Sequence, residues 1–399
     1  MTTWLNFAVV LLLTCAPWGA QCVYKYRLPV SLTLVKNTTA TTLGAYCLDG
    51  TLPAYQFNKG FGSGIRNWLL HFEGGGWCND VESCLERAIT RHGSTNYMDK
   101  VGTFSGILSD NVSLNPDFYN WNRVKLRYCD GASFAGDSKF DNGTKLLYFR
   151  GQKIWQAIIH DLLPLGLANA DKALLSGASA GGLAAFLHCN EFSSFLPKTA
   201  TVKCISDAGF FLDAPDIAKH YTIRTYFNDV VSLQGVEKNL DLKCTSSVDD
   251  PRLCFFEQHL LNYIRKPVFI LNTAYDVFQL YNIFVPPTAD VLKQWSHCKH
   301  NITTCTTTQI ETLQAYRQLM IQTLDDFYKH SASGGMFIDS CFAHSQIERQ
   351  DNWFAADSPT VQKKKIAEAV GDWYFERTVT KLIDCLYPCN KSCKNLLPA

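Results

Sequence analysis

The sequence has little net charge and contains no block of like charges. Its 37 Lys and Arg side chains nearly balance its 36 Asp and Glu side chains, which leaves a formal net charge of +1 at pH 7. Nucleic-acid-binding proteins depend on a basic surface that neutralises phosphates, so this composition predicts no nucleic-acid partner. The same balance excludes strong long-range attraction of a polyanion, whose binding would require a local group of cations.

The chain also lacks linkers, repeats and, beyond its first residues, long apolar runs. No Pro-, Gly- or Ser-rich stretch divides the sequence, so we expect one large domain over residues 23–399. The apolar run Phe7–Leu13 is too short to cross a bilayer, which requires about 20 residues. Small residues follow it, and residues 1–20 are therefore predicted to be a cleaved signal peptide. No Lys or Arg precedes the run, which leaves a retained membrane anchor as the alternative.

Cysteine, by contrast, is abundant, with 16 residues in the chain. So many thiols would be unusual in a reducing cytosol, and they favour an oxidising compartment in which disulfides persist. Two pairs that lie close in sequence, Cys78 with Cys84 and Cys298 with Cys305, are candidates for local bridges. Loss of Cys15 with the signal peptide would leave an odd number, so we expect at least one cysteine to be free or paired with another chain.

Three more cysteines cluster near the C-terminus, at Cys385, Cys389 and Cys393. We expect disulfides here that tie the end of the chain to the domain. A zinc site built from these thiolates is the alternative, but the sequence has no second paired motif to complete it.

Residues 172–190, KALLSGASAGGLAAFLHCN, form the most informative pattern of the sequence. An apolar run leads into Gly-Ala-Ser-Ala-Gly, and a small-residue segment with helical character follows. A sharp turn from strand to helix lifts a hydroxyl out of the sheet, and the small flanking residues leave room for an acyl group. The helix also directs its free N–H groups to the same place. This pattern predicts that Ser179 is a nucleophile.

A second motif lies upstream, where the short apolar strand Trp68–Phe72 leads into Gly74-Gly75-Gly76. Such glycines let backbone N–H groups turn inward. In hydrolases of this kind one of these amides joins the amide after the serine, here that of Ala180, to stabilise a tetrahedral oxyanion. A tight connection with no chemical role is the alternative for the three glycines. The neighbouring His71 and Glu73 are predicted to be structural.

An acid and a base then follow in the order that this architecture requires. The strand-like run KPVFILNTAYD ends in Asp276, a position from which a carboxylate can orient an imidazole. Asp207, at the end of VKCISD, is the alternative acid. We favour Asp276 because Asp207 ends the first strand after the serine, a less usual place for the acid. After the short strand in GGMFIDSCFAHSQ comes His344, the predicted base, whereas His188 on the helix after the serine is expected to lie away from the nucleophile.

Strand-like runs alternate with helical stretches along the chain. The runs are VKLRYC, ADKALLSG, VKCISD, PVFILNT and GGMFIDS, and the helical stretches include KIWQAIIHDLLPLGL and TLQAYRQLMIQTLDDFYKHS. Such alternation predicts an α/β fold with a mostly parallel central sheet and helices on both faces. Residues 211–265 and 277–310 are expected to be insertions that carry cap or rim elements.

The chain resembles the plant pectin acetylesterases, in the family that also contains the animal Notum carboxylesterases. The motifs that carry the resemblance are HFEGGGWCNDVESC, SGASAGG, SDAGFFLD, NTAYDVFQ, SCFAHSQ and DCLYPCNKSC. The resemblance implies an α/β-hydrolase fold and a serine esterase whose mechanism needs no metal or organic cofactor. Plant members of the family remove acetyl groups from galacturonan.

The resemblance also implies roles for individual residues. The side chains that match the family's triad are Ser179, Asp276 and His344, and the oxyanion positions fall on the amides of Gly75, Gly76 or Trp77 and of Ala180. The sequence departs from the family directly after the acid. A small polar residue and Trp usually follow there, whereas this chain has Val277 and Phe278. The departure leaves the triad intact and affects the expected shape of the acyl pocket.

Together these observations predict a secreted enzyme of the cell wall that hydrolyses acetyl esters of pectin through an acyl-enzyme on Ser179. Its expected partner is acetylated pectin, with no membrane span once the signal peptide is removed. One alternative is a Notum-like deacylase of a protein-linked lipid, which would need a long apolar tunnel. The other is a catalytically silent wall-binding protein on a hydrolase scaffold.

Two sets of surface residues complete the expectations. Sequons that fit passage through the secretory pathway occur at Asn37, Asn111, Asn142, Asn301 and Asn390, and if used they mark surface loops. Cations that precede the serine could supply a basic rim, with ordinary solvated surface as the alternative. These cations are Arg66, Arg91, Lys100, Arg123, Lys125 and Arg127.

Overall fold

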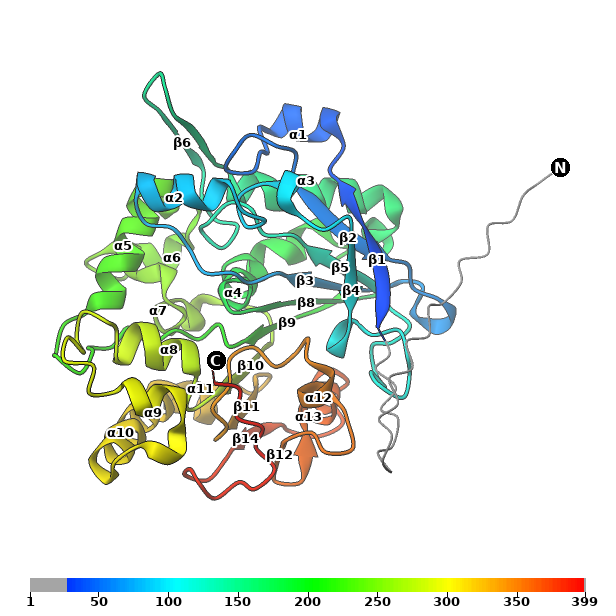
Figure 1. Ribbon diagram of the computed structural model, residues 1–399. Helices are drawn as coiled ribbons and strands as arrows, with labels where there is room; N and C mark the ends of the chain where they lie inside the picture. The colour runs from blue at the N-terminus through cyan, green and yellow to red at the C-terminus, as the bar shows by residue number, and fades with distance from the viewer. Residues whose placement is uncertain (1–26, 398–399) are drawn as a thin grey trace, which may run out of the picture.

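A central β-sheet organises the chain in the computed structural model, which describes residues 27–397 (Figure 1). The strands of this sheet are β1 (Leu28–Leu34), β2 (Ala54–Asn58), β3 (Asn67–Phe72), β4 (Val101–Phe104), β5 (Asn122–Leu126), β8 (Lys172–Ala178), β9 (Thr201–Asp207), β10 (Val268–Thr273), β11 (Gly335–Asp339) and β14 (Lys381–Ile383). Their order across the sheet is β14-β11-β10-β9-β8-β3-β5-β2-β1-β4. Two hairpins lie outside it, β6 (Ser138–Asp141) with β7 (Leu146–Phe149) and β12 (Thr360–Val361) with β13 (Lys364–Lys365).

Most neighbours in this sheet run parallel. Every pair from β14 through β11, β10, β9, β8 and β3 to β5 is parallel, whereas β2, β1 and β4 extend the β5 edge in antiparallel fashion. The five strand-like runs of the sequence coincide with β5, β8, β9, β10 and β11. The expected α/β fold with a mostly parallel sheet is therefore confirmed.

Helices surround the sheet. They are α1 (Asn37–Leu43), α2 (Val81–Ala88), α3 (Gly151–Leu162), α4 (Ala180–Phe192), α5 (Thr222–Gln234), α6 (Leu242–Thr245), α7 (Glu257–Leu260), α8 (Val277–Gln279), α9 (Ser296–His300), α10 (Thr307–Thr323), α11 (Asp325–His330), α12 (Gln350–Trp353) and α13 (Ile366–Tyr374). The stretch expected as one helix over 312–331 is two helices, because Leu324 ends α10 in a tightened turn in which its N–H donates to the carbonyls of Met320 and Gln322.

The sheet separates two hydrophobic clusters, because alternate residues of a strand face opposite sides. On β8, Ala173 and Leu175 belong to the larger cluster, together with apolar residues of α3, α4 and α10. Leu174 belongs to the second cluster, with residues of α13. Helices therefore cover both faces of the sheet, as expected.

The two segments expected as insertions contain helices of their own. Residues 211–265 carry α5, α6 and α7, and residues 277–310 carry α8 and α9. In Figure 1 these helices gather at one side of the sheet, away from β1. Among residues 27–397, no helix combines the length and apolar character needed to cross a bilayer. The predicted signal peptide lies outside the described residues.

Seven disulfides pair the fourteen cysteines in the described part of the chain. They are Cys47–Cys129, Cys78–Cys84, Cys189–Cys204, Cys244–Cys254, Cys298–Cys305, Cys341–Cys393 and Cys385–Cys389. Both predicted local bridges are confirmed. The cysteines that remain are Cys15 and Cys22, so the odd cysteine expected after removal of the signal peptide is Cys22, outside the described residues.

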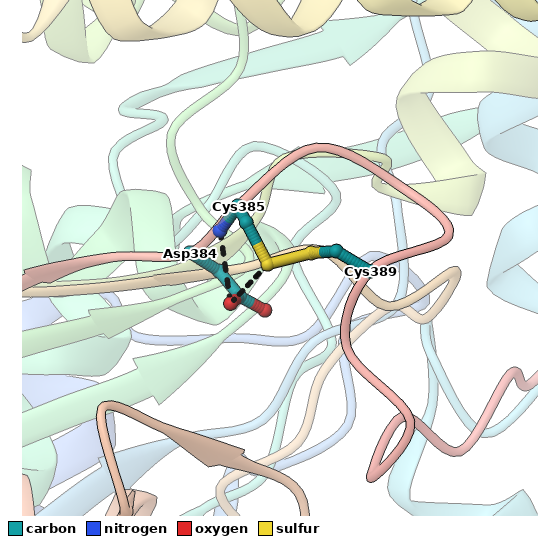
Figure 2. Close-up of side chains that lie close together, drawn as sticks. All are labelled: Asp384, Cys385 and Cys389. Carbon is teal, nitrogen blue, oxygen red and sulfur yellow. Dashed lines mark hydrogen bonds between the residues drawn. A yellow bond between two sulfur atoms is a disulfide. The ribbon is translucent and has the colours of Figure 1, made fainter.

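The cysteine cluster near the C-terminus forms disulfides, as expected. Cys393 pairs with Cys341 and thereby ties the end of the chain to the domain, while Cys385 and Cys389 pair with each other beside Asp384 (Figure 2). A sulfur in a disulfide is not the thiolate that zinc requires. The geometry of this cluster therefore does not support the zinc alternative.

Candidate active site

Ser179 lies at the turn between β8 and α4, as the sequence predicts. Its φ of 58° and ψ of −127° are backbone angles that a residue other than glycine rarely adopts. Glycines on either side make the turn possible. A Cβ at Gly177 would lie 1.9 Å from the carbonyl oxygen of Gly181, and one at Gly181 would lie 2.2 Å from that of Phe72. The Ser179 N–H also donates to the Asp207 carbonyl (2.8 Å), which anchors the turn to β9.

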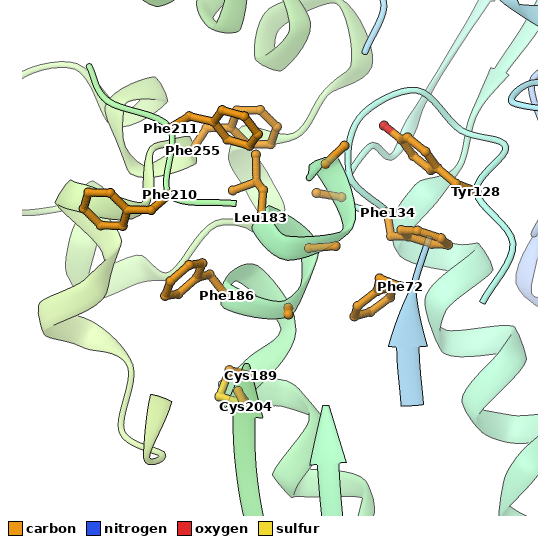
Figure 3. Close-up of a cluster of buried hydrophobic side chains, with 14 of the residues drawn as sticks. Phe72, Tyr128, Phe134, Leu183, Phe186, Cys189, Cys204, Phe210, Phe211 and Phe255 are labelled. Carbon is orange, nitrogen blue, oxygen red and sulfur yellow. A yellow bond between two sulfur atoms is a disulfide. The ribbon is translucent and has the colours of Figure 1, made fainter. Parts of the chain in front are cut away.

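Aromatic side chains enclose the helix that follows the serine. Figure 3 shows Phe72, Phe134 and Tyr128 on one side of α4 and Phe210, Phe211 and Phe255 on the other, with Phe186 of α4 itself extending toward the second group. The Cys189–Cys204 disulfide joins α4 to β9. Close packing leaves little freedom for the helix, so its first N–H groups have a fixed position behind Ser179.

The glycine loop after β3 lies directly against the serine. A Cβ on Gly74 would lie 2.9 Å from the Cβ of Ser179. Three side chains hold the carbonyl groups of this loop, with Arg87 Nη1 donating to Gly75 (2.9 Å), Tyr128 Oη to Gly76 (2.8 Å) and Tyr226 Oη to Trp77 (2.9 Å). The backbone N–H groups of Gly75, Gly76, Trp77 and Ala180 have no acceptor within residues 27–397. This arrangement leaves amides near Ser179 that could hold an oxyanion.

A continuous chain of hydrogen bonds joins Ser179 to the predicted base and acid. His344 Nε2 lies 2.8 Å from Ser179 Oγ, and His344 Nδ1 lies 2.8 Å from Asp276 Oδ2. Because a carboxylate can only accept, Nδ1 carries the proton and the lone pair of Nε2 faces the hydroxyl. Asp276 is fully buried, while 18% of the His344 side chain is exposed. The structure thus brings together the three side chains that the sequence singles out.

Backbone contacts fix the loops that carry the acid and the base. The Asp276 carboxylate accepts the N–H of Gln279 (3.0 Å) at the start of α8. The carbonyl of Ala343, next to His344, accepts the N–H of Val277 (3.3 Å) and the hydroxyl of Thr273 (3.1 Å). The loops after β10 and β11 are therefore tied to each other, which holds the imidazole against the carboxylate.

Asp276 also sets the proton affinity of His344. Burial alone would lower the pKa of His344, but the charge of Asp276 and the hydrogen bond to Nδ1 outweigh burial and raise this pKa above its usual value of 6.5. A more basic imidazole is better suited to take the proton of a serine hydroxyl.

Asp207, the alternative acid, has a different place in the structure. It does not bond to His344, and its Oδ2 accepts the N–H groups of Gln346 (2.6 Å) and Ile347 (2.7 Å). Burial raises the pKa of Asp207 to about 7. Asp207 therefore holds the chain just after His344, and the preference for Asp276 agrees with the geometry.

Ser179 opens into a cavity of about 520 Å³, which we name the serine cavity. Its lining residues are Glu73, Gly74, Gly75, Gly76, Arg91, His92, Lys125, Ala178, Ser179, Phe278, His344, Ser345 and Glu348. Sequence reasoning did not single out His92 or Glu348. Their only sequence signal is proximity, since His92 follows Arg91 and Glu348 lies in the loop that carries His344.

A second cavity, the apolar hollow, has a volume of about 320 Å³. Its lining residues are Gly76, Trp77, Thr222, Ile223, Tyr226, Phe278 and Asn282. The serine cavity and the apolar hollow share only Gly76 and Phe278. Phe278, one of the two residues after Asp276 that differ from what the resemblance implies, therefore lies at the boundary between the serine cavity and the apolar hollow.

The other residues near the motifs have structural partners. His71 bonds through Nδ1 to Ser176 Oγ (2.9 Å) and lies 3.3 Å from Glu348 through Nε2. Glu73 holds the chain at Tyr128 by accepting its N–H (3.1 Å). His188 is buried in α4, nine residues after Ser179, where Nε2 bonds to the Phe134 carbonyl (3.1 Å). These contacts agree with the structural roles expected from the sequence.

The structure separates the six cations that were expected as a basic rim. Only Arg91 and Lys125 line the serine cavity. Arg127 is buried in an ion pair with Glu73, and Arg66 pairs with Asp171 at the surface (2.6 Å). Lys100 is exposed and Arg123 is buried, and neither lines the serine cavity. Of the six cations, two therefore contribute to the serine cavity, Arg91 and Lys125, and the other four do not form a basic rim around it.

The five sequons lie outside the strands. Asn37, Asn142 and Asn301 are exposed, and Asn111 and Asn390 are partly buried. The side-chain amide of Asn390 donates to the Thr360 carbonyl (2.9 Å) and to Asp384 (2.6 Å). Because a glycan attaches at this nitrogen, Asn390 is the least available of the five.

Comparison with known proteins agrees with this geometry. The family model described as Pectinacetylesterase matches residues 23–394. The chain is 51% identical to pectin acetylesterase 5 of Arabidopsis thaliana over 90% of its own length and 84% of that protein, and 48% identical to pectin acetylesterase 4 over 90% and 87%. The solved structure of the Wnt deacylase Notum from Drosophila has the same fold. The two structures superpose with a TM-score of 0.76 and are 24% identical in sequence. The match covers 92% of this chain and 100% of the Notum chain.

Proposed function

Because this chain belongs to the pectinacetylesterase family, we propose that it is a serine esterase that hydrolyses acetyl esters of pectin and releases acetate. The observation that carries the proposal is the hydrogen-bonded chain from Ser179 through His344 to Asp276 at the wall of an open cavity. We also propose that the enzyme is secreted to the cell wall. Seven disulfides in the described residues support an oxidising compartment.

The reaction follows from the protonation states of this chain. His344 Nε2 takes the proton of Ser179 while Oγ attacks the acetyl carbonyl, and Asp276 stabilises the imidazolium that forms. His344 then gives this proton to the sugar oxygen as its bond to the acetyl carbon breaks, so the sugar leaves as an alcohol and an acetyl-enzyme remains. Water attacks the acetyl carbon with His344 again as base, the bond to Ser179 Oγ breaks, His344 returns the proton to Oγ, and acetate leaves.

Backbone amides stabilise the negative oxygen of each tetrahedral intermediate. The Ala180 N–H supplies one donor, and an N–H from Gly75, Gly76 or Trp77 supplies another. The fixed carbonyls of this loop support the assignment, since they keep the amides in place before the substrate arrives. Loss of a single oxyanion donor typically lowers turnover about a hundredfold to a thousandfold.

Lipid deacylation would need a long apolar tunnel that starts at the serine. The serine cavity is instead open, and four of its lining side chains, Glu73, Arg91, Lys125 and Glu348, carry charge. The apolar hollow is separated from it by Phe278. This shape favours a small acyl group on a polar substrate over a fatty acyl chain. A catalytically silent wall-binding protein would not need to keep the hydrogen-bonded serine, histidine and aspartate.

The test is acetate release from acetylated galacturonan by the secreted protein, with short-chain and long-chain aryl esters as comparison substrates. We expect acetate from the polymer and from short esters, and loss of about a thousandfold or more of the activity in Ser179→Ala. Retention of activity in a folded Ser179→Ala protein would overturn the assignment of the nucleophile. A preference for long chains would favour the lipid deacylase.

A further inference from the structure

We propose that Arg91 and Lys125 form a subsite in the serine cavity that binds a free carboxylate of the galacturonan chain. This inference rests on the proposed function, and it identifies the form of the polymer that the enzyme prefers. Each galacturonate unit bears a carboxylate when it is not methyl-esterified. The subsite therefore predicts a preference for acetylated galacturonan with few methyl esters.

The two cations reach the serine cavity from separate elements. Arg91 lies in the turns after α2, and Lys125 lies on β5 beside β3. Both line the cavity into which Ser179 and His344 open. An anion bound between them would therefore share the cavity with the ester that Ser179 attacks.

Arg91 and Lys125 each form one hydrogen bond to a carboxylate of the protein. Arg91 Nη1 donates to Glu73 Oε1 (2.8 Å), and Lys125 Nζ donates to Glu348 Oε1 (2.6 Å). These are the only hydrogen bonds of the two side chains among the described residues. A guanidinium has five N–H donors and an ammonium has three, so each side chain has donors beyond the one that bonds its carboxylate. The side chain of Arg91 is 49% exposed and that of Lys125 is 16% exposed, so the ligand would bind mainly through Arg91, with Lys125 at the wall of the cavity.

The carboxylates do not cancel the positive charge at this place. Burial alone would raise the pKa of Glu73, but Lys125, Arg127 and Arg91 together lower it below its usual range. Glu348 is likewise ionised, since Lys125 and His71 outweigh its burial and lower its pKa. Arg127 supplies a third cation through its buried pair with Glu73 (2.9 Å). The cations around Glu73 and Glu348 thus outnumber these two carboxylates, which leaves net positive charge beside the serine cavity.

His92 does not compete for this role. Burial, together with the charges of Arg91 and Arg87, lowers the pKa of His92 to about 4, so the imidazole is neutral at the pH of the reaction. Its buried Nε2 lies beside Gly75 and has no partner among the described residues. Attraction for an anion therefore falls to Arg91 and Lys125.

Arginine favours a carboxylate in particular. The planar guanidinium presents parallel N–H groups that match the two oxygens of a carboxylate, and charge-assisted hydrogen bonds of this kind are about twice as strong as neutral ones. A methyl ester has no charge and loses this contact. The same polymer in its free-acid and methyl-esterified forms therefore tests the subsite from the substrate side.

The experiment measures acetate release from acetylated polygalacturonate and from the same polymer after methyl esterification, at matched acetyl content. The wild-type protein is compared with Arg91→Gln and with the double variant Lys125→Met/Glu348→Gln, which removes both charges of that ion pair. Arg66→Gln is the matched control, because Arg66 is an exposed arginine paired with Asp171 outside the serine cavity. Circular dichroism verifies that each variant is folded.

We expect kcat/KM of the wild type to be about tenfold or more higher on the free-acid polymer, and this preference to weaken with added salt. Arg91→Gln should abolish most of the preference through a higher KM, and Arg66→Gln should retain it. An unchanged ratio in both folded cavity variants would overturn the subsite. A wild type that cleaves aryl acetates but releases no acetate from either polymer would instead overturn the proposed function, and the subsite with it.

Discussion

The ring of Phe278 stacks on the imidazole of His344, with the ring centroids 5.2 Å apart and the planes at 26°. The same ring meets the edges of Trp77 (6.0 Å) and Phe211 (5.6 Å). Phe278 follows Asp276 by two residues, so the turn that fixes the acid also fixes this ring. The Phe278 side chain therefore packs on the imidazole of His344 and also lies at the boundary between the serine cavity and the apolar hollow.

Replacement of Phe278 by Ala should open the apolar hollow to longer acyl chains. Each methylene that becomes buried contributes about 0.8 kcal/mol, which is close to a fourfold gain. We expect the ratio of kcat/KM for aryl octanoate over aryl acetate to rise at least tenfold in Phe278→Ala. Steady-state kinetics on a series of aryl esters from acetate to octanoate measures this ratio.

A second substitution provides the control for this prediction. Ile223 lines the apolar hollow but not the serine cavity. In the Phe278→Ala background, Ile223→Trp should fill the opened space and restore the preference for acetate. A folded Phe278→Ala protein with the wild-type ratio would show that Phe278 does not limit chain length.

Asp207 is predicted to act as a positioning residue for the base. Asp207→Ala removes the acceptor of the Gln346 and Ile347 N–H groups and should lower kcat about tenfold or more, because His344 loses its fixed place. Asp207→Asn keeps an acceptor oxygen and should retain most of the activity. The comparison of the two variants on aryl acetate is the measurement. Equal losses in both would instead indicate that the charge of Asp207 matters.

Most of the parallel part of the sheet could be predicted from the sequence, whereas the parallel edge strand β14 and the antiparallel edge could not. Strands such as β8 and β10 are buried on both faces and appear as continuous apolar runs. β4, with sequence VGTF, and β14, with sequence KLI, are short and only partly buried. Their assignment depends on strand partners that are distant in sequence, which no local pattern indicates.

The candidate site shows a similar division. Ser179, Asp276 and His344 could be identified because each follows a recognisable strand and because their order is characteristic. Arg91 and Lys125 could not be separated from other cations, since membership of one cavity depends on how loops fold over β3 and β5. The catalytic roles of the triad and of the oxyanion amides remain predictions, which the kinetic experiments test.

The raised pKa of His344 predicts how the activity depends on pH. His344 must be neutral to accept the serine proton, so activity is lost as the pH falls through its pKa. Because this pKa lies above 6.5, the acid limb of the kcat/KM profile should have its midpoint above pH 6.5. Asp276→Asn removes the larger of the two charges that raise this pKa, so burial, which lowers the pKa, is opposed only by the charge of Asp207.

Proton NMR of the histidine rings can follow this shift where activity is too low to measure. In Ser179→Ala the His344 resonance should titrate above pH 6.5, and in Ser179→Ala/Asp276→Asn it should titrate at a lower pH than in Ser179→Ala. Assignment of the resonance comes from the spectrum of His344→Gln. An unchanged midpoint in the double variant would show that Asp276 does not control the proton affinity of the base.

The Cys341–Cys393 disulfide links the end of the chain to the loop of the base. Cys341 precedes His344 by three residues, and the tail beyond Cys393 pairs with Phe342, whose N–H donates to Asn395 (3.0 Å) and whose carbonyl accepts the N–H of Leu396 (2.6 Å). The bridge closes a loop of 52 residues. For a loop of this length, chain entropy predicts that removal of the bridge lowers the free energy of unfolding by about 4 kcal/mol.

The Cys298–Cys305 bridge provides the comparison. It spans 7 residues and should contribute about 2 kcal/mol. Urea unfolding of Cys341→Ala/Cys393→Ala and of Cys298→Ala/Cys305→Ala compares the contributions of the two bridges to stability. Only the Cys341→Ala/Cys393→Ala variant should also lose kcat when it is heated to temperatures below its unfolding temperature. The reason is that only the Cys341–Cys393 bridge holds the chain beside His344.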